Sequence, residues 1–359
     1  GCAVIREGST KIMVVAGGSG GHILPAVAFC ETLADMNRPA PAVVFVTSRS
    51  KGLEDLVSSS VKTYVLSGRR SVGGLCRLFF QAAGLLIKER PAIVVGFGGY
   101  LTVPFVFAGR FTGAKVMIHE QNVLPGRANR ILGALAAHRI IISFDRSRAY
   151  FGRKNRKVFL ARYPLRRALQ PVARHEAFAQ LGLEEGLFTI LVIGGSQGAH
   201  RLNQAFTDAV RLNKDRGRWQ IIHCSGSADL DFVRRAYEGL GVRCKVFAFL
   251  DQMHYAYSVA DLVVARAGAG CVHEVMRFGL PSVLVPYPHA GQHQLENARV
   301  LAEKGAALLL EEKRLTPELL SGLLDLFSED AFRRKTMAAI ARSLEGASAA
   351  MSVAEAVLA

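Results

Sequence analysis

Residues 260–298 constrain the fold of this 359-residue chain more than any other stretch; they read ADLVVARAGAGCVHEVMRFGLPSVLVPYPHAGQHQLENA. The runs Leu262–Ala265 and Ser282–Val285 are too short for helices and are rich in valine, which predicts buried parallel strands. Between them, a glycine turn after Arg266 opens a helix that carries Glu274. In open α/β sheets of this kind, ligands bind beyond the carboxyl ends of the strands, where the helices begin.

The polar groups of this stretch suit one class of ligand. Arg266, the amides of 268–271 and Glu274 combine a cation, helix-start N–H groups and a lone carboxylate. Such groups match a diphosphate joined to a ribose. The loop after the second strand adds polar side chains at His289, Gln292, His293, Gln294 and Asn297. From this stretch alone, an ordinary strand–helix–strand unit with an Arg–Glu surface pair remains the alternative.

Composition narrows the class of protein. The length favours two domains, and 50% apolar with 21% charged residues is ordinary for a soluble globular enzyme. No apolar run reaches the ~18 residues of a membrane span, and the first residues do not have the pattern of a signal peptide. The six cysteines show no CxxC pair, which favours reduced thiols in a cytoplasm.

Net charge points to an anionic partner. The chain has 45 Lys and Arg against 29 Asp and Glu, a balance of +16, with denser basic runs at 69–70, 146–157 and 162–167. Nucleic acid, an anionic lipid surface and a phosphorylated substrate all fit this balance. Because the sequence has no nucleic-acid-binding motif, no zinc-ligand spacing and no basic tail, we expect no nucleic-acid partner.

Glycine turns follow strand-like runs in both halves of the chain. Lys11–Ala16 leads into GGSGGHILPA, Ile93–Val95 into GFGGY, and Phe188–Ile193 into GGSQGA. The polar tetrapeptide HEQN follows Lys115–Ile118, and such a loop is costly to bury without a function. We therefore predict an α/β fold of two Rossmann-like, doubly wound parallel-sheet domains that face a central cleft.

The boundary between the two domains is predicted near Pro164, which holds the chain extended before a new helical segment begins. We expect an acceptor-binding and membrane-associating domain at 1–163, a nucleotide-sugar domain at 164–340, and a terminal helix at 341–359 that packs back on the first domain. Leu75, Leu78, Phe79, Ala82, Leu85 and Leu86 recur at helical spacing, beside Arg77, Lys88 and Arg90. This pattern predicts a core-facing amphipathic helix, whose basic and bulky apolar residues can also meet an anionic bilayer.

Other site types fit less well. GGSGG is neither the GxGxxG fingerprint nor a Walker loop, since no acid follows the second strand and no GK[ST] is present. Asp229 and Asp231 precede a helical run and are interpreted as helix-capping residues rather than metal ligands. His119, His223 and His289 form no i,i+4 ligand pair. We assign no metal site and no cofactor.

Taken in order, GGSGGHILPA, GFGGY, HEQN, GGSQGA, FLDQMHYAYSVADLVVARAGAGCVHE and HQLENA resemble the bacterial MurG family along nearly the whole chain. The resemblance implies the GT-B fold and an inverting N-acetylglucosaminyltransferase of the family 28 type. Its substrates would be UDP-GlcNAc and lipid I (undecaprenyl-pyrophosphoryl-MurNAc-pentapeptide), with GlcNAc moving to the MurNAc 4-hydroxyl to form lipid II. It also implies a peripheral place on the cytoplasmic face of the bacterial plasma membrane, against an anionic membrane surface. Roles in peptidoglycan synthesis, cell shape and cell division follow, with cell-wall synthesis proteins as possible partners.

The resemblance assigns roles residue by residue. Uracil would contact Leu250, and the ribose would bind Glu274. The diphosphate would be held by Ser196, Arg266, Ala269, Gly270 and Cys271, with Arg166 nearby, and GlcNAc would contact Asn122 and Gln294. The acceptor side would be closed by Ser19, Gly20, Gly21 and His22. For the base that deprotonates the acceptor hydroxyl, His22 and Glu120 are both candidates. The chain departs from the family pattern at Tyr163, Gly270, Cys271 and His273, which affects the phosphate contacts more than the reaction.

Two alternative functions remain compatible with the sequence. A UDP-GlcNAc 2-epimerase or another lipid glycosyltransferase of the same fold would use similar motifs, but an epimerase needs no lipid acceptor. A degenerate nucleotide-sugar-binding scaffold is the non-enzyme reading. The presence of both His22 and Glu120 argues against such a scaffold.

Overall fold

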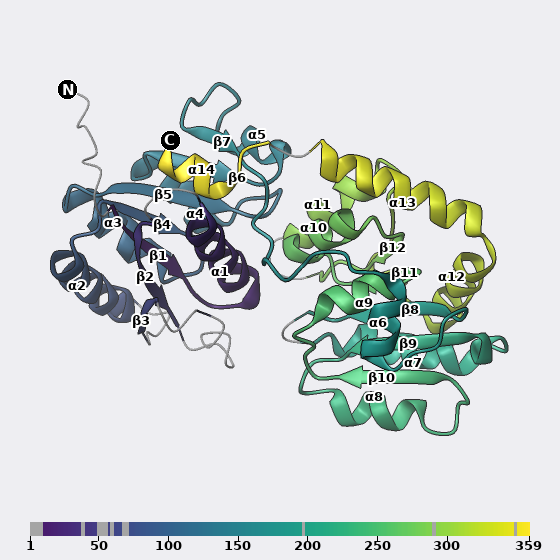
Figure 1. The fold of residues 1–359 in the computed structure, drawn as a ribbon. Helices are drawn as coiled ribbons and strands as arrows, with labels where there is room; N and C mark the ends of the chain where they lie inside the picture. Colours follow the sequence, from purple (N-terminus) through teal and green to yellow (C-terminus); the bar gives the residue numbers. More distant parts are fainter. Residues whose placement is uncertain are drawn as a thin grey trace. The chain divides into compact units, whose positions relative to one another are not determined.

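The structure, a computed structural model, describes residues 10–36, 40–48, 57, 61–66, 72–195, 198–288, 292–347 and 350–359. The chain forms two compact units: unit 1 is Gly1–Arg167 with Ser348–Ala359, and unit 2 is Ala168–Ala347 (Figure 1). Unit 1 thus extends four residues past the expected limit at 163, and unit 2 extends beyond 340 because its last helix runs to Gly346.

Unit 1 is built on a seven-stranded parallel sheet in the order β3-β2-β1-β4-β5-β6-β7. Its strands are β1 (Lys11–Ala16), β2 (Ala42–Thr47), β3 (Lys62–Val65), β4 (Ile93–Gly96), β5 (Lys115–Glu120), β6 (Arg139–Ile142) and β7 (Val158–Leu160). Its helices are α1 (Gly20–Asp35), α2 (Val72–Glu89), α3 (Thr102–Phe111), α4 (Arg127–Leu135), α5 (Arg148–Phe151) and α14 (Val353–Leu358). The central strands are buried on both faces, as their continuous apolar runs predict.

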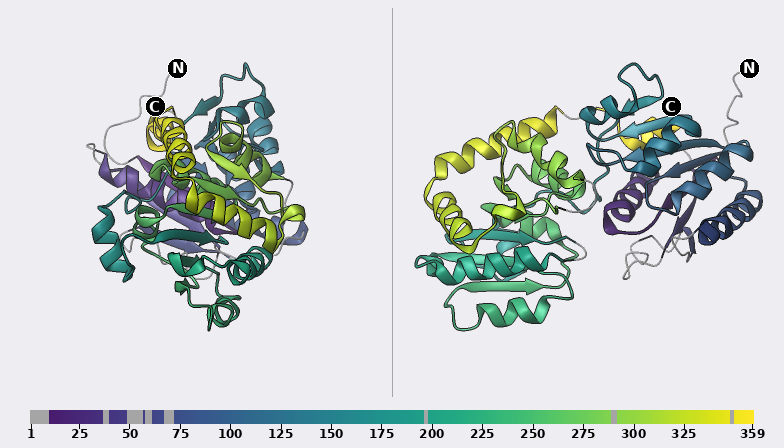
Figure 2. Two further views of the ribbon diagram at one scale, coloured as in Figure 1. Left: turned by 90° about the vertical axis from the view of Figure 1, so that its right-hand side faces the viewer. Right: turned by 180° about the vertical axis from the view of Figure 1, so that it is seen from behind.

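Alternate residues of these strands enter two separate cores. Met13 and Val15 of β1 pack with buried residues of α2, α3 and α4 on one face of the sheet. Ile12 and Val14 pack with α1 and α14 on the other face. Figure 2 shows the ribbon of this unit from two further sides. The terminal helix begins with a Ser352–Glu355 capping box, and the Arg139 guanidinium donates to the Ala356 carbonyl (2.8 Å). The end of the chain therefore completes unit 1.

Unit 2 repeats the same winding with a six-stranded parallel sheet in the order β10-β9-β8-β11-β12-β13. Its strands are β8 (Phe188–Ile193), β9 (Trp219–Cys224), β10 (Arg243–Phe247), β11 (Leu262–Ala265), β12 (Ser282–Leu284) and β13 (Ala307–Leu309). Its helices are α6 (Arg174–Leu181), α7 (His200–Leu212), α8 (Leu230–Tyr237), α9 (Met253–Val259), α10 (Ala269–Phe278), α11 (His293–Ala302), α12 (Pro317–Glu329) and α13 (Ala331–Gly346). The helices α7, α8 and α12 supply one large core cluster, while α9 contacts β8 and α10.

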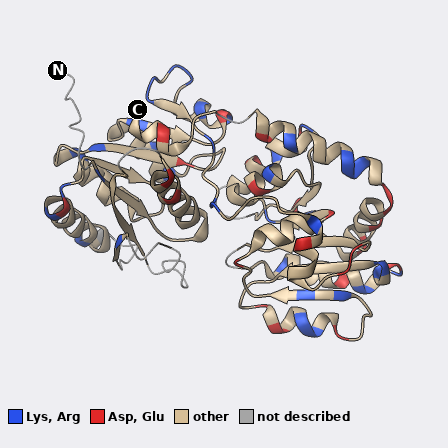
Figure 3. Cartoon of the chain, in the orientation of Figure 1, with Lys and Arg blue, Asp and Glu red and all other residues tan. Residues whose placement is uncertain are grey.

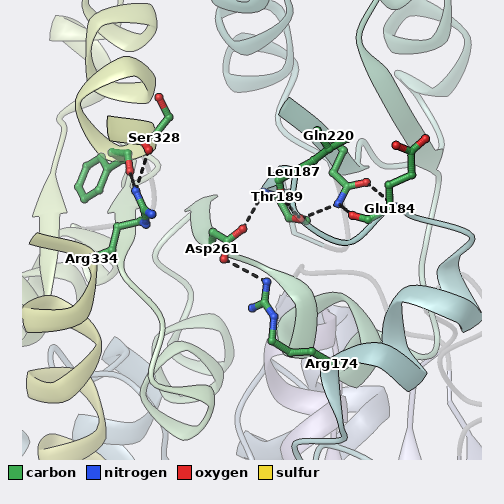
Figure 4. A network of polar contacts seen from close by, with 9 residues as sticks. Arg174, Glu184, Leu187, Thr189, Gln220, Asp261, Ser328 and Arg334 are labelled. Carbon is green, nitrogen blue, oxygen red and sulfur yellow. Dashed lines mark hydrogen bonds and ion pairs between the residues drawn. The ribbon is translucent and has the colours of Figure 1, made fainter. Parts of the chain in front are cut away.

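Polar side chains at the amino ends of the unit 2 strands are bonded to one another (Figure 4). The Gln220 amide of β9 donates to the Glu184 carbonyl (2.7 Å) and to Thr189 Oγ1 (2.9 Å). Asp261, just before β11, accepts from the Thr189 N–H (2.9 Å) and from Arg174 (3.1 Å). This network joins β8, β9 and β11 within the unit, so these polar groups have a structural use.

Two details differ from the sequence-based expectations. HEQN was expected to follow β5 as a loop, but His119 and Glu120 are its last two residues, because β6 runs alongside and pairs with them. Asp229 precedes α8, yet its side chain makes no capping bond, since its carboxylate accepts from His200 (2.9 Å) and Asn203 (2.8 Å) instead. In the described part of the chain, the helices are too short or too polar to cross a bilayer.

Candidate active site

Several of the predicted site residues lie where the strand order of each sheet changes direction. In unit 1 this point lies between β1 and β4, and in unit 2 between β8 and β11. At such a point the connections leave the two strands toward opposite faces of the sheet, which opens a crevice beyond their carboxyl ends. Residues 17–19 and 97–99 follow β1 and β4; residues 194–195 and 266–268 follow β8 and β11.

His22 lies in the first turn of α1, immediately after β1. Ser19 occupies the N-cap position, where its carbonyl accepts from the His22 N–H (3.0 Å) while its side chain makes no capping bond. Gly20 and Gly21 are the first helical residues, whose amides have no partner within a helix. The four residues predicted to close the acceptor side are therefore consecutive at one helix start, as a ligand-binding turn requires.

The His22 ring is seated by the loop that follows β4. Its Nδ1 lies 3.0 Å from the Phe97 carbonyl oxygen and also contacts the Gln121 side-chain amide. A Cβ on Gly98, whose φ is +102°, would stand 2.5 Å from that ring nitrogen. Glycine is therefore required at this position of the GFGGY turn both by its backbone conformation and by the imidazole beside it.

Glu120, the other candidate base, is a buried carboxylate with many hydrogen-bond donors around it. Oε1 accepts from the backbone (2.9 Å) and the side chain (3.2 Å) of Asn122, and Oε2 accepts from the Gly126 N–H (3.1 Å) and Asn129 Nδ2 (2.9 Å). Burial raises its pKa, and these bonds oppose the rise. With so many donors already bound, Glu120 organises the loop after β5. This geometry favours His22 as the base.

Asn122, predicted to meet the sugar, is fixed from two sides. In addition to its bonds to Glu120, its carbonyl accepts from Ser147 Oγ (2.9 Å). Asn129 also donates to the His119 carbonyl (3.2 Å), which ties α4 to the end of β5. Sequence reasoning missed Asn129 and Ser147, because neither belongs to a recognisable motif.

In unit 2, Glu274 lies one turn into α10, which begins at Ala269, Gly270 and Cys271 after the N-cap Gly268. Its half-buried carboxylate accepts from the Tyr257 hydroxyl of α9 (2.6 Å). Burial raises the pKa of Glu274, and the bond from Tyr257 opposes that rise. Tyr257 lies within a family motif, but no role was predicted for it, because its contact with Glu274 joins two different helices.

Arg266 directly follows β11, and its side chain is 8% exposed. The guanidinium donates to the carbonyls of Val285 (3.2 Å) and Pro286 (3.4 Å) after β12, and it forms an ion pair with Glu312. Glu312 was not anticipated from the sequence. These contacts hold an arginine, suited to phosphate, beside the start of α10.

The start of α11 holds the neighbouring loops together. Gln294 Oε1 accepts from the Tyr287 N–H (2.9 Å), and Asn297 Nδ2 donates to the Ala267 carbonyl (3.2 Å). Leu250 lies half-buried in the loop between β10 and α9. Together with Arg266 and Glu274, these residues come from the carboxyl-end side of the unit 2 sheet.

Two further predicted donor-site residues, Ser196 and Arg166, are not among these unit 2 contacts. Ser196 is outside the described residues. Arg166 belongs to unit 1, where its guanidinium lies 3.3 Å from Glu31 Oε1 of α1. Among the departures from the family pattern, burial raises the pKa of the Cys271 thiol, which keeps the thiol neutral, and Tyr163 is buried near His119.

Comparisons with known proteins agree with this arrangement. The profile of the glycosyltransferase family 28 N-terminal domain matches residues 12–141, and that of the C-terminal domain matches residues 189–354. A UDP-N-acetylglucosamine--N-acetylmuramyl-(pentapeptide) pyrophosphoryl-undecaprenol N-acetylglucosamine transferase of Geobacter sulfurreducens is 36% identical, covering 96% of this chain and 96% of its own. The protein of the same name from Syntrophus aciditrophicus is 34% identical, covering 98% and 99%.

Solved structures extend the likeness to the fold. MurG of Acinetobacter baumannii has a TM-score of 0.71 and 27% identity, covering 94% of this chain and 95% of its own. A putative UDP-N-acetylglucosamine 2-epimerase of Listeria monocytogenes has a TM-score of 0.66 at 16% identity, covering 92% and 91%, and shares the fold alone. The predicted fold class, GT-B, is confirmed. The chain belongs to glycosyltransferase family 28 and, within it, to the MurG family that its motifs resemble.

Proposed function

We propose that this protein transfers GlcNAc from UDP-GlcNAc to the MurNAc 4-hydroxyl of lipid I, with inversion at the anomeric carbon, to form lipid II. The observation that carries the proposal is that each unit places different reactive groups at the point where the strand order of its sheet changes direction. Unit 2 offers Arg266 and Glu274 at a helix start, and unit 1 offers a seated histidine, His22. Relatives named for this transfer, 34–36% identical over almost the whole chain, support the same reading.

The donor half of the reaction follows from unit 2. The Glu274 carboxylate can accept bonds from both ribose hydroxyls, while Arg266 and the amides of α10 neutralise the diphosphate. When the bond between the sugar and the diphosphate breaks, UDP gains negative charge. Arg266 and the helix start stabilise that charge where it develops. Ser196, Gln294 and Arg166 are further donor-site candidates.

The acceptor half follows from unit 1. His22 takes the proton of the 4-hydroxyl, the oxygen attacks the anomeric carbon, and UDP leaves from the opposite face, which inverts the configuration. Asn122, held by Glu120, is suited to bind the GlcNAc. The amides at Gly20 and Gly21 suit the diphosphate of the lipid acceptor.

We also propose that unit 1 binds the anionic cytoplasmic face of the plasma membrane. Phe80 and Ile87 lie seven residues apart on α2 and are 75% and 64% exposed; Phe111, at the end of α3, is 81% exposed. Exposed Arg77 and Lys88 lie on the same helix, and Lys and Arg occur across both units (Figure 3). A pocket of about 400 Å³ adjoins these residues, lined by Leu86, Ile87, Arg90, Pro91, Thr112, Gly113 and Ala114. Arg69 and Arg70, part of the predicted basic stretch, lie outside the described residues.

The transfer is tested by incubating the protein with UDP-GlcNAc and a lipid I analogue. We expect a β-linked disaccharide product and one UDP for each product formed. A parallel incubation without acceptor separates the alternatives, because an epimerase would change UDP-GlcNAc there. Absence of disaccharide under conditions in which UDP-GlcNAc binds would contradict the proposal.

Membrane binding is tested by sedimentation with vesicles. Anionic vesicles should bind the protein, and binding should weaken with salt, since each basic residue near the surface contributes ~1 kcal/mol. Phe80→Ser with Phe111→Ser should reduce binding. Phe332→Ser in α13 is the matched control, because Phe332 is 82% exposed but lies in unit 2. An equal loss in the control would contradict the assignment to unit 1.

A further inference from the structure

The environment of His22 Nδ1 determines which ring nitrogen holds the proton. The Phe97 carbonyl oxygen, 3.0 Å away, can only accept a hydrogen bond. A nitrogen that faces such an oxygen at this distance must therefore carry hydrogen. In the neutral ring, the lone pair then belongs to Nε2.

Gln121 adds a second contact at the same nitrogen. In the structure the amide nitrogen, Nε2, faces His22 Nδ1; the residue is 2% exposed, and its Oε1 is buried with no partner among the described residues. The oxygen and nitrogen of an amide have nearly the same shape, so the surrounding bonds decide which of them faces the ring. With the amide turned so that Oε1 faces the ring, Nδ1–H is shared between two acceptors, and the unpaired oxygen gains a donor.

We propose that Gln121 is a positioning residue which, with the Phe97 carbonyl, holds His22 as the Nδ1–H tautomer and aims Nε2 at the acceptor hydroxyl. The inference rests on the proposed function of His22 as the base. Gln121 cannot ionise, so it orients the ring without drawing the proton from it. Gly98 leaves room for the imidazole ring in this position, because any side chain there would displace it.

Two titratable groups in the strand before Gln121, those of His119 and Glu120, have hydrogen-bond partners of their own. His119, the neighbour of Glu120 in β5, is fully buried, and burial lowers its pKa to about 3, with His22 adding to the effect. It is therefore neutral at physiological pH. Its Nε2 is bonded to Ser143 Oγ (2.9 Å), and its ring lies 5.0 Å from that of Phe97. The nearby Glu120 carboxylate is already bonded to its own loop.

Nuclear magnetic resonance of protein labelled with ¹⁵N in histidine tests the tautomer directly. His22 is assigned by the signal that His22→Gln removes, and we expect the Nδ1–H pattern. His138 is an internal control in the same unit, because its Nδ1 accepts from the Val116 N–H (3.0 Å) and must show the opposite tautomer. Gln121→Leu, close in volume but unable to bond, should shift His22 toward a mixture. An Nε2–H pattern in the wild type, or no change in Gln121→Leu, would overturn the inference.

Kinetics then measure what the contact between Gln121 and the His22 ring contributes to catalysis. Gln121→Leu should lower kcat about tenfold, a part of the ~10²–10⁴ that a general base supplies, with the KM for UDP-GlcNAc unchanged. Gln121→Glu should restore much of kcat and move the acid limb of the pH profile up by about one unit, because a carboxylate beside Nδ1–H favours the imidazolium. An unmoved acid limb would count against the contact. If His22→Gln stays fully active while the tautomer is as expected, the assigned base is wrong but the positioning stands.

Discussion

Glu120 of unit 1 and Glu274 of unit 2 stand at comparable places, each near the carboxyl end of a central strand, and burial raises the pKa of both. They differ in their partners. Among the described residues, Glu120 accepts from two backbone N–H groups and two side-chain amides, whereas Glu274 accepts from the Tyr257 hydroxyl. A carboxylate offers about four acceptor positions. Glu120 has therefore used its capacity within the protein, and Glu274 retains most of its own for a ligand.

The difference shows how a carboxylate near a binding site can be classified. A buried carboxylate whose lone pairs are all bonded serves the backbone around it. One with a single partner and raised pKa pays a desolvation cost that a bound hydroxyl group can offset. The comparison therefore predicts that Glu120 matters more for the stability of the fold, and that Glu274 matters more for donor binding.

The largest effect is expected from Glu120→Ala on stability. It leaves several donors without an acceptor, and each buried one costs ~1–3 kcal/mol, so unit 1 should lose roughly 3 kcal/mol or more. Calorimetry measures the loss. Fluorescence of Trp219, the single tryptophan, reports on unit 2 and should show an unchanged transition. Glu274→Ala is the matched control and should cost about 1 kcal/mol. Equal losses would remove the distinction.

Donor binding should show the reverse order. Glu274→Ala should weaken UDP-GlcNAc about ten- to a hundredfold, because a hydrogen bond to a charged group contributes ~1.5–3 kcal/mol. Isothermal titration with the 2′-deoxyuridine analogue gives the control: the wild type should discriminate against it, and the variant should not. If the variant discriminates as well as the wild type, Glu274 does not bind the 2′-hydroxyl.

The raised pKa of Glu274 predicts opposite pH trends in binding and in stability. Below its folded pKa, which lies above the ordinary 4.5, the protonated carboxyl loses acceptor capacity, and UDP-GlcNAc affinity should fall up to about tenfold per pH unit. In the same window the folded protein binds the proton more tightly than the unfolded chain does. The contribution of Glu274 to unfolding free energy therefore increases as pH falls, by up to ~1.4 kcal/mol per unit.

Glu274→Gln should flatten both trends, and the difference between variant and wild type isolates this group. The subtraction matters because buried His223, whose pKa burial lowers to about 3, acts in the other direction. Its unfolded form takes up a proton below about pH 6.5, so stability falls as pH decreases toward 3. Identical pH profiles for Glu274→Gln and wild type would contradict the assigned pKa.

The smallest effect should come from Tyr257→Phe. Removing one hydroxyl donor should weaken UDP-GlcNAc about two- to tenfold, because a typical hydrogen bond contributes ~0.5–1.5 kcal/mol. Since the Tyr257 bond lowers the Glu274 pKa, its loss should also move the fall in affinity to higher pH. The measurement is the same titration across pH. Unchanged affinity and an unchanged profile would mean that Tyr257 only fills the core.

Much of the architecture was predictable because it depends on local patterns. Short runs such as Ile93–Val95 and Leu262–Ala265 fix buried parallel strands, and glycine turns fix where helices begin. The end of β5 was misplaced because its last two residues, His119 and Glu120, are polar and become a strand only by pairing with β6. Asp229 was misjudged for a similar reason, since its partners His200 and Asn203 come from a different helix.

The sequence by itself determined the class of fold, the family and the residue types at each strand end, because periodicity, glycine turns and ordered motifs are properties of short segments. Only the tertiary structure decided how those residues divide their roles. Gln121 and His22 are 99 positions apart, and Tyr257 and Glu274 lie on different helices. Whether a carboxylate is saturated, or which nitrogen of a histidine carries hydrogen, depends on donors and acceptors that meet only when distant segments pack together.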